Sequence, residues 1–292
     1  MVDVKAAVIE EITAFSLPVG MLSILRLDKI HPIISGNKWF KLKGYMEEAK
    51  SKEVEAIASF GGAYSNHIVA LAYAGKQAGI ATVGFIRGED GDSESLKQAR
   101  EFGMKLYFVS RDDYRDKEKI KQNFQDPHWL WVAEGGYGVG GAEGAADILR
   151  LPGCEQFTHI VCACGTGTMM AGLINSSLPH QQIMGISVLK NHTGLDTAIK
   201  KLLIKPQQNN WETKHEFHFG GYAKHPQKLL AFINTFWQQT SIPTDIVYTS
   251  KLCYATMQLI AENYFNATSK ILIIHSGGLQ GNHSLKQDQL VF

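Results

Sequence analysis

Short apolar segments alternate along the chain with segments in which apolar residues recur at helical spacing. Most of the short segments are apolar without interruption, which is typical of strands in a parallel sheet covered by helices on both faces. The predicted strands are residues 55–60, 81–86, 105–109, 129–133, 159–163, 183–188 and 271–275. The predicted helices are residues 67–78, 93–102, 142–149, 168–176, 226–239 and 252–264. This alternation predicts an α/β protein with mostly parallel sheets.

The length of the chain favours two lobes. With 292 residues and 45% hydrophobic content, it exceeds a typical single domain and can bury one large core or two smaller ones. Two α/β lobes with a cleft between them fit this length. The glycine-dense segment 134–141 is the candidate crossing point between the lobes. The alternative for this segment is a flexible loop without a chemical role.

Charge and composition exclude several classes of partner. The 29 basic and 28 acidic residues give a net charge of +1 without a basic stripe, so we expect no nucleic-acid partner. The sequence has no run of eighteen apolar residues, so we expect no membrane span. Residues 1–11 lack a basic segment followed by an apolar one, which favours a cytoplasmic location. The four cysteines form no CxxC pair and are expected to be buried thiols.

A metal site is not expected, although the chain has 11 histidines. His215 and His218 are three residues apart, but residues 214–219 resemble a strand, which would place the two side chains on opposite faces. HExxH and Cys/His clusters with zinc spacing are absent from the sequence.

Two lysines, Lys38 and Lys41, have the spacing that places both on one face of a helical turn. If that turn lines a cavity, one amine can form an imine with a carbonyl compound such as pyridoxal phosphate while the other pairs with an anion. The alternative is a solvated surface turn, because most lysines are exposed.

A first glycine-rich junction between a strand and a helix lies at residues 60–67. Ser65 and Asn66 are of the types that cap a helix, and free backbone N–H groups at this point can hold a carboxylate. The alternative is that Ser65 only caps the helix.

A second junction, residues 162–172, runs from an apolar strand through a glycine and threonine loop into a helix. Backbone N–H groups and hydroxyls in such a loop can cradle a phosphate. The loop matches neither a Walker sequence nor GxGxxG with a downstream acid, so the phosphate monoester of a cofactor suits it better than a nucleoside triphosphate. A plain turn is the alternative.

A third junction, residues 274–281, brings small residues to the end of the last strand, where they lie against a flat ligand or simply terminate the strand. Two tyrosines, Tyr222 and Tyr248, also stand near glycines or turn residues. A phenol acts as an acid or a base when its surroundings lower its pKa.

Together these motifs resemble the pyridoxal-phosphate enzymes of the 1-aminocyclopropane-1-carboxylate deaminase and D-cysteine desulfhydrase family. The resemblance extends from about residue 26 to residue 281 and rests on the order and spacing of short motifs. They are GNKWFKL at 36–42, FGGAYSNH at 60–67, EGG at 134–136, CGTGT at 164–168, VYTSK at 247–251 and HSGG at 275–278.

The resemblance implies a two-lobed fold like that of the tryptophan synthase β subunit, known as fold type II of the pyridoxal-phosphate enzymes. On this basis we expect residues 1–43 and 142–292 to form a larger, cofactor-binding domain. Residues 44–141 would form a smaller domain on the substrate side. By analogy with the family, the protein is expected to be a homodimer.

The resemblance also implies roles for individual residues. Lys38 aligns with the imine-forming lysine, and Lys41 with the lysine that pairs with the cofactor phosphate. Asn66 matches the residue that hydrogen-bonds the 3′ oxygen of the cofactor. The loop expected to bind the phosphate from the other side consists of Gly165, Thr166, Gly167 and Thr168.

On the substrate side, the resemblance assigns the carboxylate to Ser65, Asn66 and His67. Ser65, Tyr222 and Tyr248 are the candidate acid–base groups beside the catalytic Lys38. Such groups argue against a protein that merely stores the cofactor.

Thr249 is the position that best discriminates within the family. In the deaminases of the cyclopropane substrate a glutamate follows the second tyrosine and contacts the pyridine nitrogen, whereas the desulfhydrases have a threonine there. A carboxylate stabilises a protonated pyridinium and strengthens the ring as an electron sink, and a hydroxyl does so much less. Thr249 therefore favours a desulfhydrase.

The sequence thus predicts β-elimination from a small amino acid such as D-cysteine, giving an oxo acid and ammonia. One alternative is opening of the cyclopropane ring, and another is racemisation or dehydration on the same fold. A non-catalytic pyridoxal-phosphate-binding protein and a nucleotide-binding protein remain the alternatives outside this chemistry.

Overall fold

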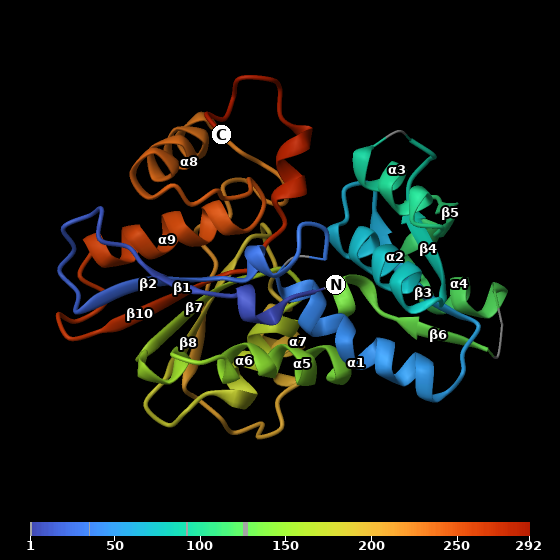
Figure 1. Cartoon of the computed structure of the whole chain (residues 1–292), viewed down its shortest axis with the longest axis horizontal. Coiled ribbons are helices and arrows are strands. Elements are labelled where there is room, and N and C mark those ends of the chain that lie inside the picture. Colours follow the sequence, from blue (N-terminus) through green and yellow to red (C-terminus); the bar gives the residue numbers. More distant parts are fainter. Residues whose placement is uncertain (1, 35, 92, 125–127) are drawn as a thin grey trace.

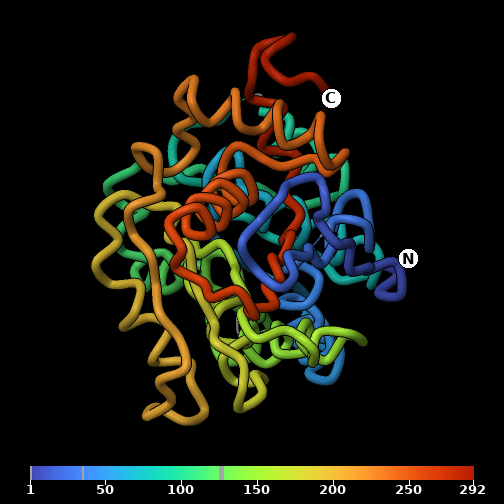
Figure 2. Tube along the Cα trace, turned by 90° about the vertical axis from the view of Figure 1, so that its left-hand side faces the viewer, coloured from blue at the N-terminus to red at the C-terminus, as the bar shows by residue number. Residues whose placement is uncertain are grey.

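The computed structural model describes residues 2–34, 36–91, 93–124 and 128–292, which form two lobes side by side (Figure 1). Each lobe is built around its own sheet, one of six strands and one of four. Strands near both ends of the chain pair in one sheet, and the side view shows a blue loop near the start of the chain beside red segments near its end (Figure 2). The protein is therefore an α/β molecule with two lobes, as the sequence predicts.

The six-stranded sheet has the order β1-β2-β10-β7-β8-β9. All neighbouring strands are parallel except β1, which pairs antiparallel with β2. The strands are β1 (Ile9–Glu11), β2 (Met21–Arg26), β7 (His159–Cys164), β8 (Gln182–Ser187), β9 (Trp211–Lys214) and β10 (Lys270–His275). The central strands are buried on both faces, as shown by Ile271–Ile274, none of which is exposed. Their uninterrupted apolar sequences follow from this burial.

The four-stranded sheet has the order β5-β4-β3-β6 and is parallel throughout. Its strands are β3 (Ala56–Gly62), β4 (Ala81–Arg87), β5 (Lys105–Val109) and β6 (Trp129–Val132). In register, Gly62 at the end of β3 lies opposite Arg87 at the end of β4. All three glycine-rich junctions and the end of β4 therefore lie at the carboxyl ends of parallel strands, where α/β proteins bind ligands.

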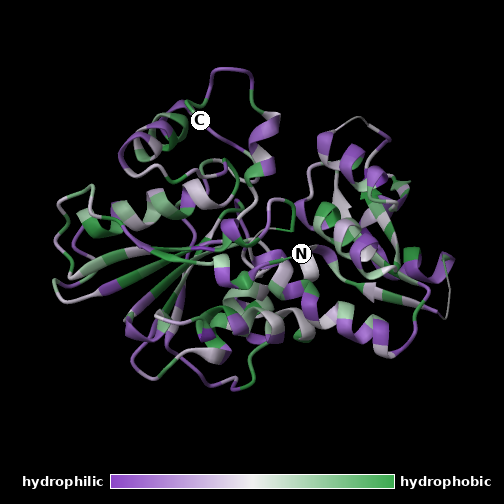
Figure 3. Ribbon diagram, in the orientation of Figure 1, coloured by the Kyte–Doolittle hydropathy of each residue, from purple (hydrophilic) through white to green (hydrophobic). Residues whose placement is uncertain are grey.

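Helices cover both faces of each sheet. In the larger lobe α8 (Gln227–Thr240) and α9 (Thr249–Ala261) pack on one face, and α5 (Val139–Ala146), α6 (Thr168–Ser176) and α7 (Leu195–Lys200) on the other (Figure 1). The smaller lobe has α1 (Asn37–Ser51), α2 (Asn66–Ala78) and α3 (Glu94–Glu101) on one face and α4 (Lys117–Asn123) on the other. Apolar residues concentrate on the strands and on the inner helix faces (Figure 3). Within the described residues no helix is both long and apolar enough to cross a membrane.

Local sequence signals set the ends of helix α2. The Oγ atom of Ser65 accepts a hydrogen bond from the backbone N–H of Ile68, as expected of an N-cap serine. At the other end, Gly79 adopts a left-handed conformation with φ +69° and closes the last turn. The capping role predicted for Ser65 is confirmed.

All seven predicted strands and all six predicted helices are present, with bounds shifted by a few residues. The prediction of a strand at residues 214–219 is wrong. Strand β9 ends at Lys214, and the chain then turns, with Phe219, Gly220 and Gly221 all at positive φ. The four cysteines are free and buried.

The division into residues 1–43 with 142–292 and residues 44–141 stays a prediction. Helix α1 runs across its first boundary, and its side chains Leu42 and Met46 contribute to the core of the smaller lobe.

Candidate active site

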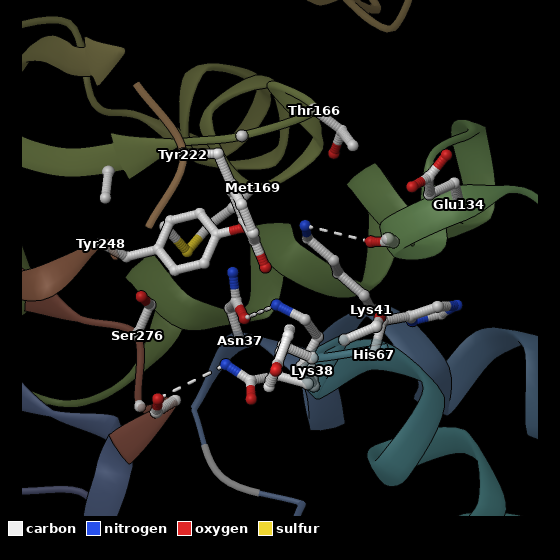
Figure 4. A pocket seen from close by; sticks show the side chains of 18 of the residues that line it. Asn37, Lys38, Lys41, His67, Glu134, Thr166, Met169, Tyr222, Tyr248 and Ser276 are labelled. Carbon is white, nitrogen blue, oxygen red and sulfur yellow. Dashed lines mark hydrogen bonds between the residues drawn. The ribbon is translucent and has the colours of Figure 1, made fainter. Parts of the chain in front are cut away.

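A cavity of about 460 Å³ lies between the carboxyl edges of the two sheets. Its walls come from the start of α1, the junctions after β3, β7 and β10, and the segments that carry Tyr222 and Tyr248 (Figure 4). Most of the predicted site residues line it. They are Lys38, Lys41, Ser65, Asn66, His67, Gly165, Thr166, Gly167, Tyr222 and Tyr248.

Helix α1 begins where two loops approach each other closely. Gly36 has φ +64°, and a Cβ atom there would lie 1.8 Å from the carbonyl oxygen of Ser276. The backbone N–H of Asn37 donates to that oxygen at 3.3 Å. A glycine at this position thus lets the start of α1 lie against the junction after β10.

Lys38 and Lys41 project from the first turns of α1 into the cavity (Figure 4). Lys38 Nζ donates to Asn37 Oδ1 at 3.0 Å, and Lys41 Nζ donates to the carbonyl oxygen of Gly135 at 3.4 Å. Neither amine has a salt bridge to a carboxylate of the described residues. The surface-turn alternative is excluded, because Lys41 is only 5% exposed.

Burial lowers the pKa of Lys38 to about 8 and that of Lys41 to about 7. The positive charge of Lys38 lowers the pKa of Lys41 further, and Asp245 partly opposes the shift of Lys38. Two desolvated amines in one cavity favour an anionic ligand, because an opposite charge restores the protonated form.

Ser65, Asn66 and His67 stand at the start of α2 on the wall beside Lys38. Asn66 Nδ2 donates to the carbonyl oxygen of Gly278 at 3.4 Å, which links the two lobes. Asn66 Oδ1 is buried without a hydrogen-bond partner among the described residues. His67 Nε2 hydrogen-bonds Ser59 Oγ at 2.9 Å, and burial lowers the pKa of His67 to about 3. His67 is therefore a neutral imidazole at physiological pH.

The loop after β7 faces the two lysines from the other side of the cavity (Figure 4). Gly167 has φ +80° and precedes Thr168, the first residue of α6. The hydroxyls of Thr166 and Thr168 lie 2.9 Å apart. Thr168 is fully buried and does not line the cavity. The helix start still offers backbone N–H groups that have no partner within the helix.

The two tyrosines form one wall. The Tyr222 and Tyr248 rings have centroids 6.3 Å apart and meet edge to face, and Lys38 Nζ lies 6.0 Å from the centroid of the Tyr248 ring. Burial raises the pKa of both phenols, that of Tyr248 most strongly. Both therefore stay protonated and can donate hydrogen bonds beside Lys38, although the raised pKa makes each a weaker acid than a free phenol.

Thr249 is buried beneath this wall and does not line the cavity. Its hydroxyl donates to Asp245 Oδ1 at 2.7 Å, and Asp245 also accepts hydrogen bonds from the backbone N–H groups of Val247, Tyr248 and Thr249. A contact between Thr249 and a pyridine nitrogen thus stays a prediction. The structure adds Asp245, a fully buried carboxylate that orders the turn carrying Tyr248.

Sequence reasoning missed several residues of the site. Asn37, Arg87 and Glu134 line the cavity, and Asp245 lies directly beneath it. A signal existed for Asp245, because an aspartate in a turn shortly before a helix accepts hydrogen bonds from the backbone N–H groups that follow it. Arg87 carries no local signal, since its position depends on the pairing of β3 with β4.

The donor set fits a flat ligand that bears a phosphate. Two buried amines without a carboxylate face the Gly165–Thr168 loop at a helix start, and the amide oxygen of Asn66 lacks a partner. An amine with a lowered pKa is suited to covalent attachment of a carbonyl compound. A ligand that carries both a phosphate and an aldehyde could bond to Lys38 through the aldehyde and bind Lys41 and the Gly165–Thr168 loop through the phosphate.

Comparison with known proteins agrees with this chemistry. The family model "Pyridoxal-phosphate dependent enzyme" matches residues 10–277. The bifunctional D-cysteine desulfhydrase and 1-aminocyclopropane-1-carboxylate deaminase of Arabidopsis thaliana is 27% identical over 88% of this chain and 72% of its own length. The D-cysteine desulfhydrase of Klebsiella pneumoniae is 20% identical over 92% of this chain and 90% of its own length.

The crystal structure of a homologue of the cyclopropane-carboxylate deaminase superposes with a TM-score of 0.80 at 22% identity, covering 94% of this chain and 90% of that one, and shows the same fold. A fungal L-serine ammonia-lyase from Rhizomucor miehei superposes with a TM-score of 0.68 at 10% identity, covering 94% and 93% of the two chains.

The chain belongs to the pyridoxal-phosphate dependent enzymes. Its similarity to cyclopropane-carboxylate deaminases and D-cysteine desulfhydrases, recognised from the short motifs, is confirmed. Its cofactor is pyridoxal phosphate, which agrees with the donor set of the cavity.

Proposed function

We propose that this protein removes the β-substituent and the amino group of a small amino acid, as a D-cysteine desulfhydrase does. For D-cysteine the balance is one water consumed, with pyruvate, ammonia and hydrogen sulfide formed. The position of Lys38 is the observation that carries the proposal. Its amine lies in the cavity with a lowered pKa, close to two protonated tyrosines.

Pyridoxal phosphate, when bound, supplies an aldehyde that bonds to amines and a ring that withdraws electrons from the α-carbon. The residues that would hold it are Lys38 by covalent attachment, Lys41 and the Gly165–Thr168 loop at the phosphate, and Asn66 at the 3′ oxygen. The lowered pKa of Lys41, whose amine has no carboxylate partner among the described residues, supports its assignment to the phosphate.

The substrate carboxylate would be received by Ser65, Asn66 and His67 at the start of α2. Backbone N–H groups at a helix start favour an anion, and a neutral His67 does not repel the amines nearby. Lys38 Nζ then takes the α proton from a fixed position. The transfer therefore needs no encounter with a base from solution. Tyr222, Tyr248 or Ser65 supplies the proton that the leaving group or the β-carbon requires.

Opening of the cyclopropane ring is the second candidate, favoured by the double activity in the name of the Arabidopsis relative. That substrate has no α proton, so Lys38 would have to act at a different carbon. A threonine rather than a glutamate at position 249 favours the desulfhydrase reaction, because this position then offers no carboxylate to the pyridine nitrogen.

The proposal is tested by product analysis with D-cysteine, L-cysteine and 1-aminocyclopropane-1-carboxylate as separate substrates. We expect pyruvate and sulfide from a cysteine enantiomer, and a Lys38→Ala variant should release neither. Formation of 2-oxobutanoate alone would identify the ring-opening reaction instead. A protein that binds the cofactor without releasing ammonia from any of the three would overturn the proposal.

We also propose that the enzyme works as a homodimer in the cytoplasm. The family resemblance supports the dimer. Light scattering of the purified protein distinguishes a mass near 32.3 kDa from twice that value.

A further inference from the structure

Arg87 is a cation of the cavity that the proposed function does not use. It is the last residue of β4 and lies opposite Gly62 in the sheet, next to the junction that leads to Ser65. A Cβ atom on Gly62 would lie 3.8 Å from Arg87 Nη2. The guanidinium therefore lies over the turn that precedes the proposed carboxylate site, and it lines the same cavity.

An aromatic platform orients this guanidinium. Arg87 Cζ lies 5.8 Å from the centroid of the Tyr114 ring, and Tyr114 is only 4% exposed. Lys117 Nζ lies 4.8 Å from the same centroid and forms a salt bridge of 3.0 Å with Glu134. A cation–π contact with a buried ring stabilises the guanidinium at this place.

The carboxylate at the cavity mouth is already paired. Glu134 has Lys117 as its partner, whereas the Arg87 side chain makes no hydrogen bond or salt bridge in the part of the chain that the structure describes. Arg87 also acts on Tyr222, since burial raises the pKa of that phenol and the positive charge of Arg87 opposes the shift. Arg87 and Tyr222 thus line the same cavity within electrostatic range of each other.

The anions of the cofactor and of a simple substrate leave Arg87 without a partner. In the proposed function the cofactor phosphate pairs with Lys41, and the α-carboxylate binds at the start of α2. Arginine presents five N–H donors in a planar fork that fits a carboxylate or a phosphate. A third anion in the complex would have to come from the side chain of the substrate.

We propose that Arg87 binds an anionic group on the substrate side chain, so that the preferred substrates are amino acids whose side chain ends in a carboxylate or a phosphate. This inference rests on the proposed function and names the substrate class for it. Arg87 acts in binding and takes no part in proton transfer.

The test compares two amino acids of nearly equal shape, aspartate and asparagine, each as the D and the L enantiomer. Their dissociation constants are measured on the holoenzyme from the change in the visible absorption of the cofactor. We expect aspartate of one enantiomer to bind about 10- to 100-fold more tightly than asparagine, the range of one charge-assisted hydrogen-bonded contact. Arg87→Met should reduce this preference to about onefold, and Arg87→Lys should keep part of it.

Arg111→Met is the matched control. Arg111 is also an exposed arginine of the smaller lobe, but it does not line the cavity. Its removal should leave the preference for aspartate intact. A second readout is kcat/KM for O-phosphoserine relative to O-acetylserine, which Arg87→Met should lower mainly through KM.

The outcomes separate this inference from the proposed function. Equal binding of aspartate and asparagine to the natural protein, or a preference that survives in Arg87→Met, would overturn the role of Arg87. If the natural protein releases ammonia from D-cysteine whatever the result for Arg87, the proposed function stands. If the natural protein releases ammonia from none of the amino acids, the proposed function and the role of Arg87 are both wrong.

Discussion

Two buried lysines, one helical turn apart, determine which ligands the cavity favours. Lys41 is 5% exposed and lies near Lys38, and neither pairs with a carboxylate of the described residues. Holding such amines out of water costs free energy until an anion arrives. This desolvation free energy favours ligand binding, because the buried amines bind a phosphate and an aldehyde more readily than solvated lysines would.

The first prediction concerns the replacement Lys41→Met in the protein freed of cofactor. The pKa of Lys41 is lowered from 10.5 to about 7, so between these values the unfolded chain binds more protons than the folded one, and stability rises with pH. Below about pH 7 the full cost is present. The variant should therefore be more stable than the natural apoprotein at pH 7, by more than about 1 kcal/mol, with the gain shrinking toward pH 10.5.

Urea unfolding at pH 7 and pH 9.5 measures this effect. Lys43→Met is the matched control, since Lys43 is exposed and pairs with Asp147 at 3.3 Å. With the cofactor present the order should reverse, because the variant lacks a cation for the phosphate. A gain of equal size at both pH values would argue against a desolvated ammonium at position 41.

At the scale of elements, the site depends on how closely helix starts and loops approach one another. The chain at Gly36 passes within contact of Ser276, and Asn66 of α2 reaches Gly278 in the same loop. These contacts fix Lys38 relative to the junction after β10 and tie the smaller lobe to the larger.

A second prediction follows for Gly36→Ala. The new Cβ atom would lie 1.8 Å from the Ser276 carbonyl oxygen at φ +64°, so both the clash and the backbone strain oppose it. We expect a loss of at least about 2 kcal/mol in unfolding free energy together with weaker cofactor binding. Gly79→Ala is the control, because Gly79 has φ +69° with no atom within 4 Å and should lose only about 1 kcal/mol. Equal losses in the two variants would contradict the proposed contact.

Lys251 connects helix α9 to the segment that carries Tyr222. Its side chain is fully buried, and Nζ donates to the carbonyl oxygens of His218 at 3.0 Å and Gly221 at 2.7 Å. Burial lowers its pKa to about 8, and Asp245 opposes the shift. Lys251 is thus a positioning residue for Tyr222.

A third prediction is that Lys251→Met lowers kcat at least about tenfold while the cofactor stays bound, since the loop that presents Tyr222 loses its anchor. Unfolding free energy should fall by about 1–3 kcal/mol, because two carbonyl groups lose their partner. Lys224→Met, an exposed lysine of the same segment, should leave both quantities nearly unchanged. A Lys251 variant with the kcat of the natural protein would refute the positioning role.

The elements predicted best from the sequence are the buried strands, because a continuous apolar run follows directly from burial on both faces. The strands of the parallel sheets are continuous apolar runs, so their positions follow from composition within a few residues. The strand expected at 214–219 is wrong because β9 ends at Lys214 and Phe219 has a positive φ, which a strand does not adopt. Periodicity also does not show that Thr249 lies beneath the cavity wall, because that depends on the four hydrogen bonds that Asp245 accepts.

At the scale of the whole molecule, the site exists only where two separate sheets meet. Its residues come from the start of α1 and from junctions more than 200 positions apart in the sequence, such as Asn66 and Gly278. The sequence brings them together only through resemblance to known enzymes, since no local pattern encodes the approach of two lobes. Neither the local sequence pattern nor the resemblance to known enzymes predicted that Arg87 lines the cavity.

A fourth prediction concerns the coupling of the lobes through the cofactor. Because its proposed ligands come from both lobes, binding should stabilise the whole molecule against unfolding, by about 2.7 kcal/mol at a concentration one hundred times Kd. Thermal unfolding with and without pyridoxal phosphate measures this. ATP should give no comparable shift, and a shift with ATP alone would favour a nucleotide-binding protein.

The most direct test of the central claim is the visible absorption spectrum of the purified protein and of its Lys38→Ala variant, recorded with pyridoxal phosphate. Separate additions of D-cysteine, L-cysteine and 1-aminocyclopropane-1-carboxylate then follow. We expect a yellow band in the natural protein that shifts with at least one amino acid, and loss in the variant of the band due to covalent attachment. A natural protein without that band, or a variant that keeps it, would contradict the assignment of Lys38 as the residue that holds the cofactor.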